Sequence, residues 1–282
     1  MKILTFDIED WFHILDNNET KSISEWSKFD SRLKLEMDFI YDILDKSKQS
    51  ATFFIVGWIA EKYPEIIREI SDRGFEIGSH SHLHQLVYEQ DKKTFYNDVE
   101  KSIRTLEDCT GKKVRSFRAP GFSIKENNKW AFEVLYELGI EIDASIFPTG
   151  RAHGGLASYK EAKPSILKYN GIQLKEFPIN THNFFGKPLI FSGGGYFRLL
   201  PYQIIKSWTN NSDYVMTYFH PRDFDYQQPI APGLSLSRRF KSYVGLKQCQ
   251  PKLEQWLKDF NFIDLETANQ EINWDKVTVV RL

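Results

Sequence analysis

Cysteine is scarce in this sequence, and so is net charge. Two cysteines, Cys109 and Cys249, stand among 282 residues, and neither belongs to a C-x-x-C pair. A disulfide framework and a cysteine-built zinc site are therefore not expected. Lys plus Arg number 37 and Asp plus Glu number 38, so the formal net charge is -1. Because binding to nucleic acid through bulk electrostatics needs a basic excess, this balance argues against a nucleic-acid partner.

Long apolar runs are also missing. No stretch reaches the length that spans a membrane, so the sequence predicts no transmembrane segment. Met1 and Lys2 lead directly into a short apolar segment that acidic residues follow, which is unlike a secretory signal peptide. We therefore expect the chain as given to stay in the cytoplasm, or to be secreted with its leader already removed. The sequence makes no prediction about the oligomeric state.

Apolar runs and amphipathic stretches alternate along the chain. Residues 51–56 are apolar and rich in β-branched and aromatic side chains, which predicts a buried strand, whereas the 3.6-residue apolar period of residues 31–48 predicts an amphipathic helix. Further strands are predicted at 2–6, 75–77, 114–117, 140–144, 171–177, 214–219 and 262–265, and further helices at 58–73, 92–109, 128–138, from about 201, and at 250–260. This alternation predicts a single α/β domain over residues 1–282, with a parallel sheet and helices outside it. About seven such units favour a (β/α) barrel, in which reactive residues follow the carboxyl ends of strands.

Acidic residues follow the first predicted strand. Asp7, Glu9 and Asp10 lie within four positions, directly before Trp11. Carboxylates that lie so close repel one another unless a cation or an arginine lies among them. The segment therefore suits a cation site, and a solvated turn is the alternative.

Histidines follow the strand at 75–77. His80 and His84 are four positions apart, so on a helical turn both imidazoles would face the same way, while His82 would point elsewhere. Neutral imidazole is a good ligand for zinc and related ions. Two imidazoles with one carboxylate from Glu9 or Asp10 would leave open positions, as catalytic metal sites do. The alternative is a polar loop that contains histidines by chance.

Two later strands also end on residues that can carry chemistry. Arg118, in the run Arg118-Ala119-Pro120, could pair with a carboxylate at the mouth of a barrel, or could form a surface salt bridge. His220 ends the strand at 214–219 and could donate a proton, although a lone histidine is more often a satisfied core residue.

Together these motifs resemble those of the polysaccharide deacetylases, the NodB-homology or carbohydrate esterase family 4 enzymes. Residues 80–84 resemble the family's metal-binding H-S/T-x-x-H motif, and residues 118–120 resemble its R-x-P motif. Residues 143–148 resemble the fourth motif, and His220 resembles the late strand-end histidine. The order and spacing of the motifs cover about residues 2–221.

One branch of the family is more similar than the rest. Residues 6–12 resemble the "DVEDW/YF" opening of bacterial deacetylases that are linked to exopolysaccharide and surface-glycan assembly. The segments 193–201, 220–221 and 238–245 are also similar to that branch. The resemblance implies a distorted (β/α) barrel of about seven parallel strands, with a family-specific extension from about residue 222.

The sequence departs from the family pattern at two places. The common opening T-F-D-D-G has adjacent aspartates, but here Ile8 follows Asp7, so both Glu9 and Asp10 stay open as the carboxylate ligand. The branch usually has H-P-W-E where this chain has H-P-R-D at 220–223, and this difference is expected to alter substrate contacts.

The resemblance implies a metal-dependent hydrolase that removes N-acetyl groups from an N-acetylated sugar, oligosaccharide or glycan precursor. His80, His84 and either Glu9 or Asp10 would hold one divalent ion, with Zn²⁺ expected. Asp7 would act as the general base, with Arg118 orienting it and holding it ionised. His220 would protonate the departing amine.

Further side chains are candidates for contact with the substrate. The glycines at 193–195 permit a close approach of the backbone, so Tyr196 and Arg198 are expected near the sugar, unless the glycines only form a tight turn. Trp11 and Pro120 could line the pocket, and Asp143 could support the acid histidine or cap its strand. Two alternative functions stay open: an allantoinase-like or deformylase-like amidohydrolase on the same scaffold, and a non-catalytic glycan-binding protein.

Overall fold

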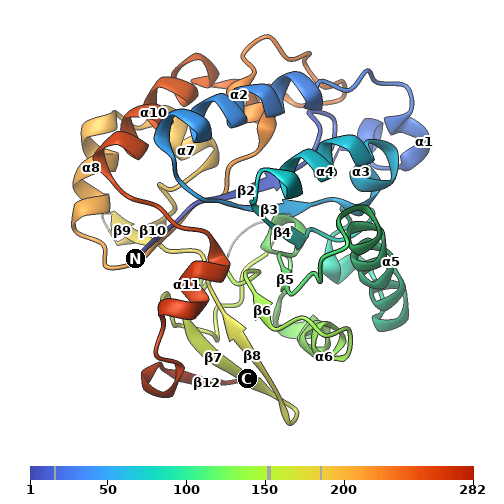
Figure 1. Cartoon of the computed structure of the whole chain (residues 1–282), viewed down its shortest axis with the longest axis vertical. Coiled ribbons are helices and arrows are strands. Elements are labelled where there is room, and N and C mark those ends of the chain that lie inside the picture. Colours follow the sequence, from blue (N-terminus) through green and yellow to red (C-terminus); the bar gives the residue numbers. More distant parts are fainter. Residues whose placement is uncertain (16, 151–153, 185) are drawn as a thin grey trace.

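The computed structural model describes residues 1–15, 17–150, 154–184 and 186–282 (Figure 1). Its main element is an eight-stranded sheet in the order β12-β7-β8-β6-β5-β4-β3-β2. The strands are β1 (Lys2–Ile3), β2 (Thr5–Ile8), β3 (Thr52–Ile55), β4 (Glu76–Ser79), β5 (Ser116–Phe117), β6 (Ile142–Asp143), β7 (Ser165–Tyr169), β8 (Ile172–Glu176), β9 (His182–Phe184), β10 (Lys187–Leu189), β11 (Val215–Met216) and β12 (Val279–Arg281).

Helices connect the strands and cover the sheet from outside (Figure 1). The α-helices are α1 (Ile23–Trp26), α2 (Leu33–Ser47), α3 (Gly57–Lys62), α4 (Pro64–Asp72), α5 (Lys92–Thr110), α6 (Trp130–Glu137), α7 (Gly194–Leu199), α8 (Tyr202–Asn210), α9 (Leu236–Tyr243), α10 (Cys249–Asp259) and α11 (Leu265–Glu271). Short 3₁₀ helices include η5 (Pro221–Phe224). Within the described ranges, no helix is both long enough and apolar enough to cross a membrane.

The sheet is mostly parallel and curls into a distorted barrel. β2, β3, β4, β5, β6 and β8 run parallel, each paired with the next. At the other edge of β2, a parallel bridge joins Phe6 to Phe219, just beyond β11. Among the described residues, no strand pairing joins β8 to β11. The two sides are linked there by a hydrogen bond from the backbone N–H of Met216 to Oδ1 of Asn180. The prediction of an α/β fold with a parallel sheet is confirmed.

Two predicted elements differ in kind from the structure, and some observed elements were not predicted. The helix expected at 58–73 is two helices, because Pro64 has no N–H for a continuing helix and starts α4 instead. Residues 262–265 form no strand: Ile263 makes a single bridge to Ile3, and α11 begins at Leu265. β7 was not predicted; it runs antiparallel to β8 and lies with β12 at the lower end of the molecule (Figure 1).

The core explains why these segments take these forms. All four residues of β3, Thr-Phe-Phe-Ile, are buried, as expected for a central parallel strand covered on both faces. The apolar residues of α2 repeat at helical spacing, so Leu33, Met37, Ile40 and Leu44 form one buried face. This packing fixes the strands whose carboxyl ends build the site.

Candidate active site

The carboxyl ends of four strands meet around one cavity of about 410 Å³. Asp7 and Glu9 lie at the end of β2, His80 follows β4, and His220 follows β11. Arg118 lies directly behind this cavity, after β5. The cavity is lined by Asp7, Glu9, His13, Ile14, Leu15, His80, Ala119, Gly121, Phe122, Gly194, Gly195, Arg198, Tyr218, His220, Arg222, Asp223, Arg238, Lys241 and Ser242.

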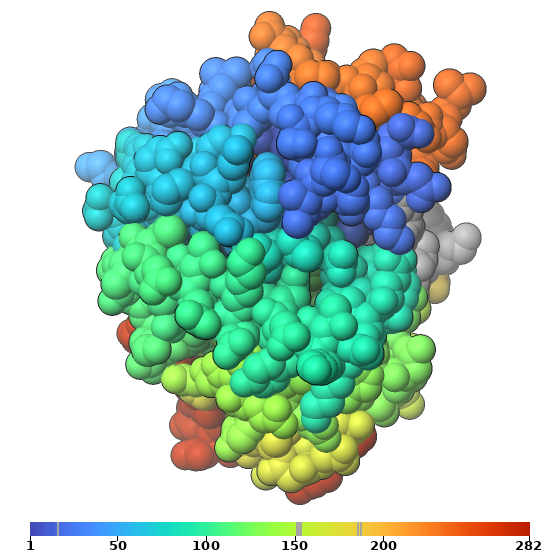
Figure 2. Space-filling view, turned by 90° about the vertical axis from the view of Figure 1, so that its right-hand side faces the viewer, coloured from blue at the N-terminus to red at the C-terminus, as the bar shows by residue number. Residues whose placement is uncertain are grey.

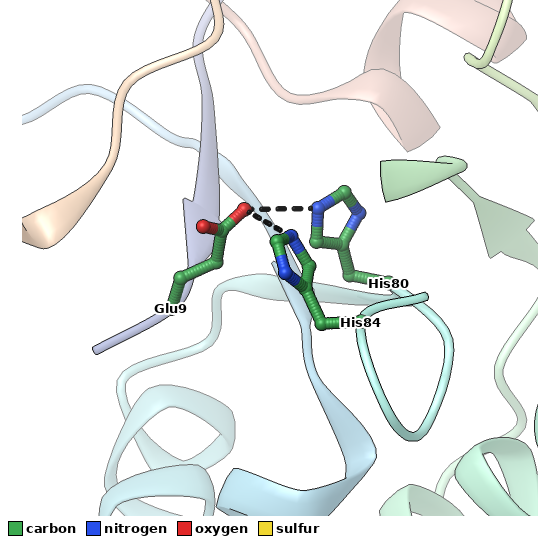
Figure 3. Close-up of side chains that lie close together, drawn as sticks. All are labelled: Glu9, His80 and His84. Atoms are coloured by element: carbon green, nitrogen blue, oxygen red, sulfur yellow. Dashed lines mark hydrogen bonds and ion pairs between the residues drawn. The ribbon is translucent and has the colours of Figure 1, made fainter. Parts of the chain in front are cut away.

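Glu9, His80 and His84 point toward one another (Figure 3). Oε1 of Glu9 lies 3.2 Å from Nε2 of His80 and 2.9 Å from Nε2 of His84. One ligand atom from each residue lies within 4.8 Å of the others, and all three side chains are buried. Burial acts to raise the pKa of Glu9, but the nearby His84 and His220 outweigh it and lower that pKa well below its ordinary value.

The atoms of this cluster fit a divalent cation. Nδ1 of His80 lies 2.7 Å from the carbonyl oxygen of Arg118 and donates to it, so in the neutral imidazole Nε2 has a lone pair directed toward Glu9. Nε2 of His84 is buried and makes no hydrogen bond of good geometry within the described residues, despite its closeness to Glu9. Lone pairs at these distances repel unless a cation lies among them, and two imidazoles with one carboxylate are a donor set that zinc accepts.

The segment that carries the two histidines is a loop, so the expected helical turn is wrong. Ser81 and His84 have positive φ values of 64° and 51°, which a right-handed helix excludes. The two imidazoles are brought together by this loop rather than by helical spacing. His82 points away, as expected, with Nε2 3.3 Å from Oε2 of Glu61.

Asp98 on α5 holds this loop in place. Its two carboxylate oxygens accept hydrogen bonds from the backbone N–H groups of His82 at 2.7 Å and Leu83 at 2.9 Å. The side chain is 8% exposed. Burial raises the pKa of Asp98 to about 6, although these two hydrogen bonds act to lower it. Sequence reasoning missed Asp98 because it stands in the middle of a helix, remote from every motif.

Asp10 lies apart from the histidines. Its Oδ1 accepts hydrogen bonds from the backbone N–H groups of Trp11 at 2.9 Å and Arg32 at 3.4 Å. Burial raises the pKa of Asp10 to about 6. Of the two carboxylates that the sequence left open, Glu9 is the one that joins His80 and His84.

Asp7 and Arg118 form a buried ion pair beside the cluster. Nη1 of Arg118 lies 2.7 Å from Oδ1 of Asp7 and also donates to Oγ1 of Thr5 at 2.7 Å. The Arg118 side chain is fully buried, and its guanidinium stacks 4.3 Å from the ring centre of Phe54. These contacts fix the Asp7 carboxylate at the edge of the cavity, so its second oxygen can accept a proton there.

His220 is fixed from its other side by Asp223. Oδ2 of Asp223 lies 3.3 Å from Nδ1 of His220, and it also accepts the backbone N–H of His220 at 3.0 Å. Nε2 of His220 lies 3.7 Å from Oε1 of Glu9. Burial acts to lower the pKa of His220, but Glu9 and Asp223 outweigh it and raise that pKa to about 9. The imidazole can therefore carry a proton toward the cavity at neutral pH.

Arg198 lines the cavity and pairs with the same aspartate, Asp223. Its Nη1 lies 3.1 Å from Oδ1 of Asp223, and the side chain is 5% exposed. Burial acts to raise the pKa of Asp223, but Arg198 and His220 outweigh it and lower that pKa to about 2. Sequence reasoning named Arg198 but gave Asp223 no role, although its place three residues after His220 in H-P-R-D was a usable signal.

The other predicted substrate contacts lie away from the described lining of the cavity. Trp11 is buried, and its Nε1 donates to the carbonyl oxygen of Asp30 at 3.0 Å. Pro120 is buried beside the lining residues, whereas Tyr196 is 51% exposed on α7. Asp143 is buried under the site, where its Oδ1 accepts the hydroxyl of Ser145 at 2.5 Å, and its contacts do not include His220.

The glycine run at 193–195 packs against Tyr218 and also lines the cavity. A Cβ atom on Gly193 would lie 2.4 Å from the carbonyl oxygen of Tyr218, so the backbone there packs too closely for a side chain. Gly194, with a φ of 56°, and Gly195 line the cavity. Glycine at 193 is thus needed for packing, and Gly194 is needed for its left-handed backbone conformation.

Comparison with known proteins divides the chain into two matches. Residues 17–142 match the family model "Polysaccharide deacetylase", and residues 144–270 match a domain of unknown function, DUF3473. The chain is 35% identical over 102 residues to a peptidoglycan-N-acetylglucosamine deacetylase of Bacillus cereus, covering 35% of this chain and 37% of that protein. It is 29% identical over 100 residues to chitin deacetylase 1 of Saccharomyces cerevisiae, covering 36% of this chain and 32% of that protein.

A solved structure agrees over the whole chain. A protein from Mycobacterium smegmatis described as a polysaccharide deacetylase superposes with a TM-score of 0.68 and 19% identity, covering 100% of this chain and 92% of that chain. At this identity the likeness concerns the fold. The chain spans about a third of the length of the two curated relatives. The polysaccharide deacetylase model thus matches residues 17–142 of this chain, and the solved structure shares its fold.

Proposed function

We propose that this protein is a metal-dependent deacetylase that hydrolyses the N-acetyl group of an N-acetylated sugar, oligosaccharide or glycan precursor. One observation carries the proposal: Glu9 and His80 of the Glu9–His80–His84 cluster line one cavity together with Asp7 and His220, which are each held by a buried partner. Both curated relatives named above are deacetylases of N-acetylated glycans, which favours this reaction over ring opening or deformylation on the same scaffold.

Glu9, His80 and His84 would hold the ion, for which we propose Zn²⁺. When bound, such an ion polarises a carbonyl oxygen and makes a water molecule easier to deprotonate. The donor set of two nitrogens and one oxygen supports this choice, and it leaves the remaining positions free for water and substrate.

The side chains around the cluster would move the protons. Asp7, held by Arg118, takes a proton from the attacking water, whose oxygen bonds to the acetamide carbonyl carbon. The carbon–nitrogen bond then breaks, and His220 gives the proton on its Nε2 to the departing amine nitrogen. The products are acetate and a free amino sugar, and Asp223 keeps the His220 ring in the orientation that this transfer needs.

Release of acetate tests the proposal directly. The protein is incubated with a panel of N-acetylated saccharides, including chitooligosaccharides and peptidoglycan fragments, with and without a chelator. Acetate that forms with at least one of them, disappears with chelator and returns when Zn²⁺ is added back would support both the reaction and the metal. Absence of acetate with every saccharide, while the protein binds Zn²⁺, would contradict the reaction.

A further inference from the structure

The chain segment that contributes to the rim of the cavity carries charged side chains of one sign. Residues 226–253 contain five basic residues and no acidic residue, although the chain as a whole has a formal net charge of -1. The aspartates directly before this run are engaged elsewhere: Asp223 pairs with Arg198, and Asp225 pairs with Arg32. Such a concentration of one sign marks a surface that attracts an anionic partner.

The helix in the middle of this run exposes large apolar side chains. α9 has no buried residue. Leu236 is 85% exposed and Phe240 is 61% exposed, the two highest values among the large hydrophobic residues that the structure describes. They are four positions apart and so share one face of the helix, next to the exposed Arg239. An apolar pair bordered by basic residues is typical of helices that lie on a lipid interface.

The same helix forms part of the rim of the cavity. Arg238, Lys241 and Ser242 belong to the cavity lining. Arg198 donates to the carbonyl oxygens of Lys241 at 3.0 Å and Ser242 at 2.9 Å, which ties α9 to α7. In Figure 2 the orange part of the chain, which includes this region, projects at the edge of the molecule beside the blue N-terminal residues.

We propose that α9 docks on an anionic lipid surface and so holds the mouth of the cavity against that surface. Leu236 and Phe240 enter the interface between headgroups and acyl chains, while Arg239 and Lys241 meet the lipid phosphates. A second copy of the chain fits less well, because a two-fold contact through α9 would set basic residues against basic residues. Docking itself does not depend on the proposed deacetylation. If both hold, the substrate class narrows to N-acetylated saccharides that are anchored to a lipid.

Sedimentation of the protein with lipid vesicles tests this surface. The chain is expected to bind vesicles that contain phosphatidylglycerol, to ignore vesicles of phosphatidylcholine alone, and to bind less as salt is raised. The double variant Leu236→Ser/Phe240→Ser should bind at least about tenfold more weakly, because it loses the apolar contact. Arg239→Ser should bind about fivefold more weakly, the loss expected for one basic residue near such a surface.

A matched control separates docking from general damage. Leu35→Ser removes an exposed leucine, 41% exposed on α2, and should bind vesicles as the parent does. No binding to phosphatidylglycerol, or equal binding by the parent and the double variant, would overturn the proposal. The proposal would also be overturned if light scattering showed that the parent is a dimer and the double variant a monomer, and if the parent did not bind vesicles.

The double variant also allows membrane docking to be tested separately from deacetylation. Leu236 and Phe240 do not line the described cavity, so acetate release from a soluble N-acetylated oligosaccharide should equal that of the parent. If the parent binds vesicles but releases no acetate from any substrate, docking stands and the proposed reaction fails. If the parent releases acetate but does not bind vesicles, the proposed reaction stands and docking fails.

Discussion

His220 and Asp223 meet twice within one turn of η5. Oδ2 of Asp223 lies 3.3 Å from Nδ1 of the imidazole and accepts the backbone N–H of the same histidine at 3.0 Å. Because the backbone contact and the ring contact share one oxygen, the ring cannot rotate without losing its partner. Nε2 is thereby left facing the cavity, 3.7 Å from Oε1 of Glu9.

Replacing His220 by alanine should remove the proton donor and leave the metal cluster intact. Proton transfer by a positioned group is worth about 10²–10⁴-fold in rate, so kcat for acetate release should fall by about that factor. Bound zinc, measured by mass spectrometry of the metal, should match the parent. Full activity in His220→Ala would remove this residue from the mechanism.

Replacing Asp223 by asparagine should have a smaller effect of the same kind. Asparagine keeps the size of the side chain but loses the charge that orients and stabilises the protonated ring, so kcat should fall about tenfold or more while KM changes little. Asp213→Asn, which alters a surface aspartate paired with Lys163, is the control and should be silent. A change confined to KM would mean that Asp223 acts on binding instead.

Replacing Glu9 and Asp10 one at a time tests which of the two carboxylates is the metal ligand. Glu9→Gln removes a charged oxygen from between His80 and His84, and should weaken zinc binding by more than about 100-fold. Asp10→Asn leaves that cluster unchanged and should bind zinc within a few fold of the parent. Titration calorimetry with Zn²⁺ compares them, and the reverse ranking would assign the ligand to Asp10.

Removing the Asp98 carboxylate should loosen the loop that carries the histidines. Asp98→Ala leaves the N–H groups of His82 and Leu83 without their acceptor, which should cost about 1–3 kcal/mol of unfolding free energy. Zinc affinity should fall about 10–100-fold, as for other residues that support metal ligands. The free energy is measured by urea unfolding of the metal-free protein.

Asp91 supplies the matched control on the same helix. Its side chain accepts the backbone N–H of Thr94 at 2.7 Å and caps the start of α5. Asp91→Ala should cost about 1 kcal/mol of stability through loss of this cap. It should leave zinc affinity unchanged. If both alanine variants lower zinc affinity equally, Asp98 has no specific role in holding the loop.

Glu36 should make the protein less stable as pH rises. Its side chain is fully buried, and neither carboxylate oxygen has a hydrogen-bond partner among the residues described. Burial, and then the charge of Asp10, raise its pKa well above the ordinary 4.5. Because the native state binds the proton more tightly than the unfolded state, this contribution is complete below pH 4.5 and is lost as pH rises toward the native pKa.

The variant Glu36→Gln should therefore lose part of this pH dependence. Relative to the parent, its free energy of unfolding should improve between pH 5 and pH 8, because glutamine takes no charge into the core. Urea unfolding of the metal-free proteins at both pH values gives the comparison. Glu65→Gln, which alters an exposed glutamate on α4, should show the same pH dependence of the free energy of unfolding as the parent. An equal pH dependence in Glu36→Gln and the parent would contradict the prediction.

Local sequence patterns predicted much of the fold, because the spacing of apolar residues within a segment determines whether it forms a helix or a strand. The apolar period of α2 and the buried run of β3 each carry their own signal, and both appear close to the expected residues. Chemistry at the ends of strands was also predictable, since parallel strands present their carboxyl ends together. β7 was missed although Asn170 and Gly171, which join it to β8, are a pair typical of hairpin turns.

The site itself divides in the same way. The sequence determined which kinds of atom were available: two imidazoles, neighbouring carboxylates, an arginine and a late histidine, each at the end of a strand. Only the tertiary structure decided that Glu9 rather than Asp10 joins the histidines, that a loop held by Asp98 brings them together, and that Asp223 holds His220. Adjacent residues point in different directions, and which of them meets a distant side chain depends on how the intervening backbone turns, a property that no short stretch of sequence contains.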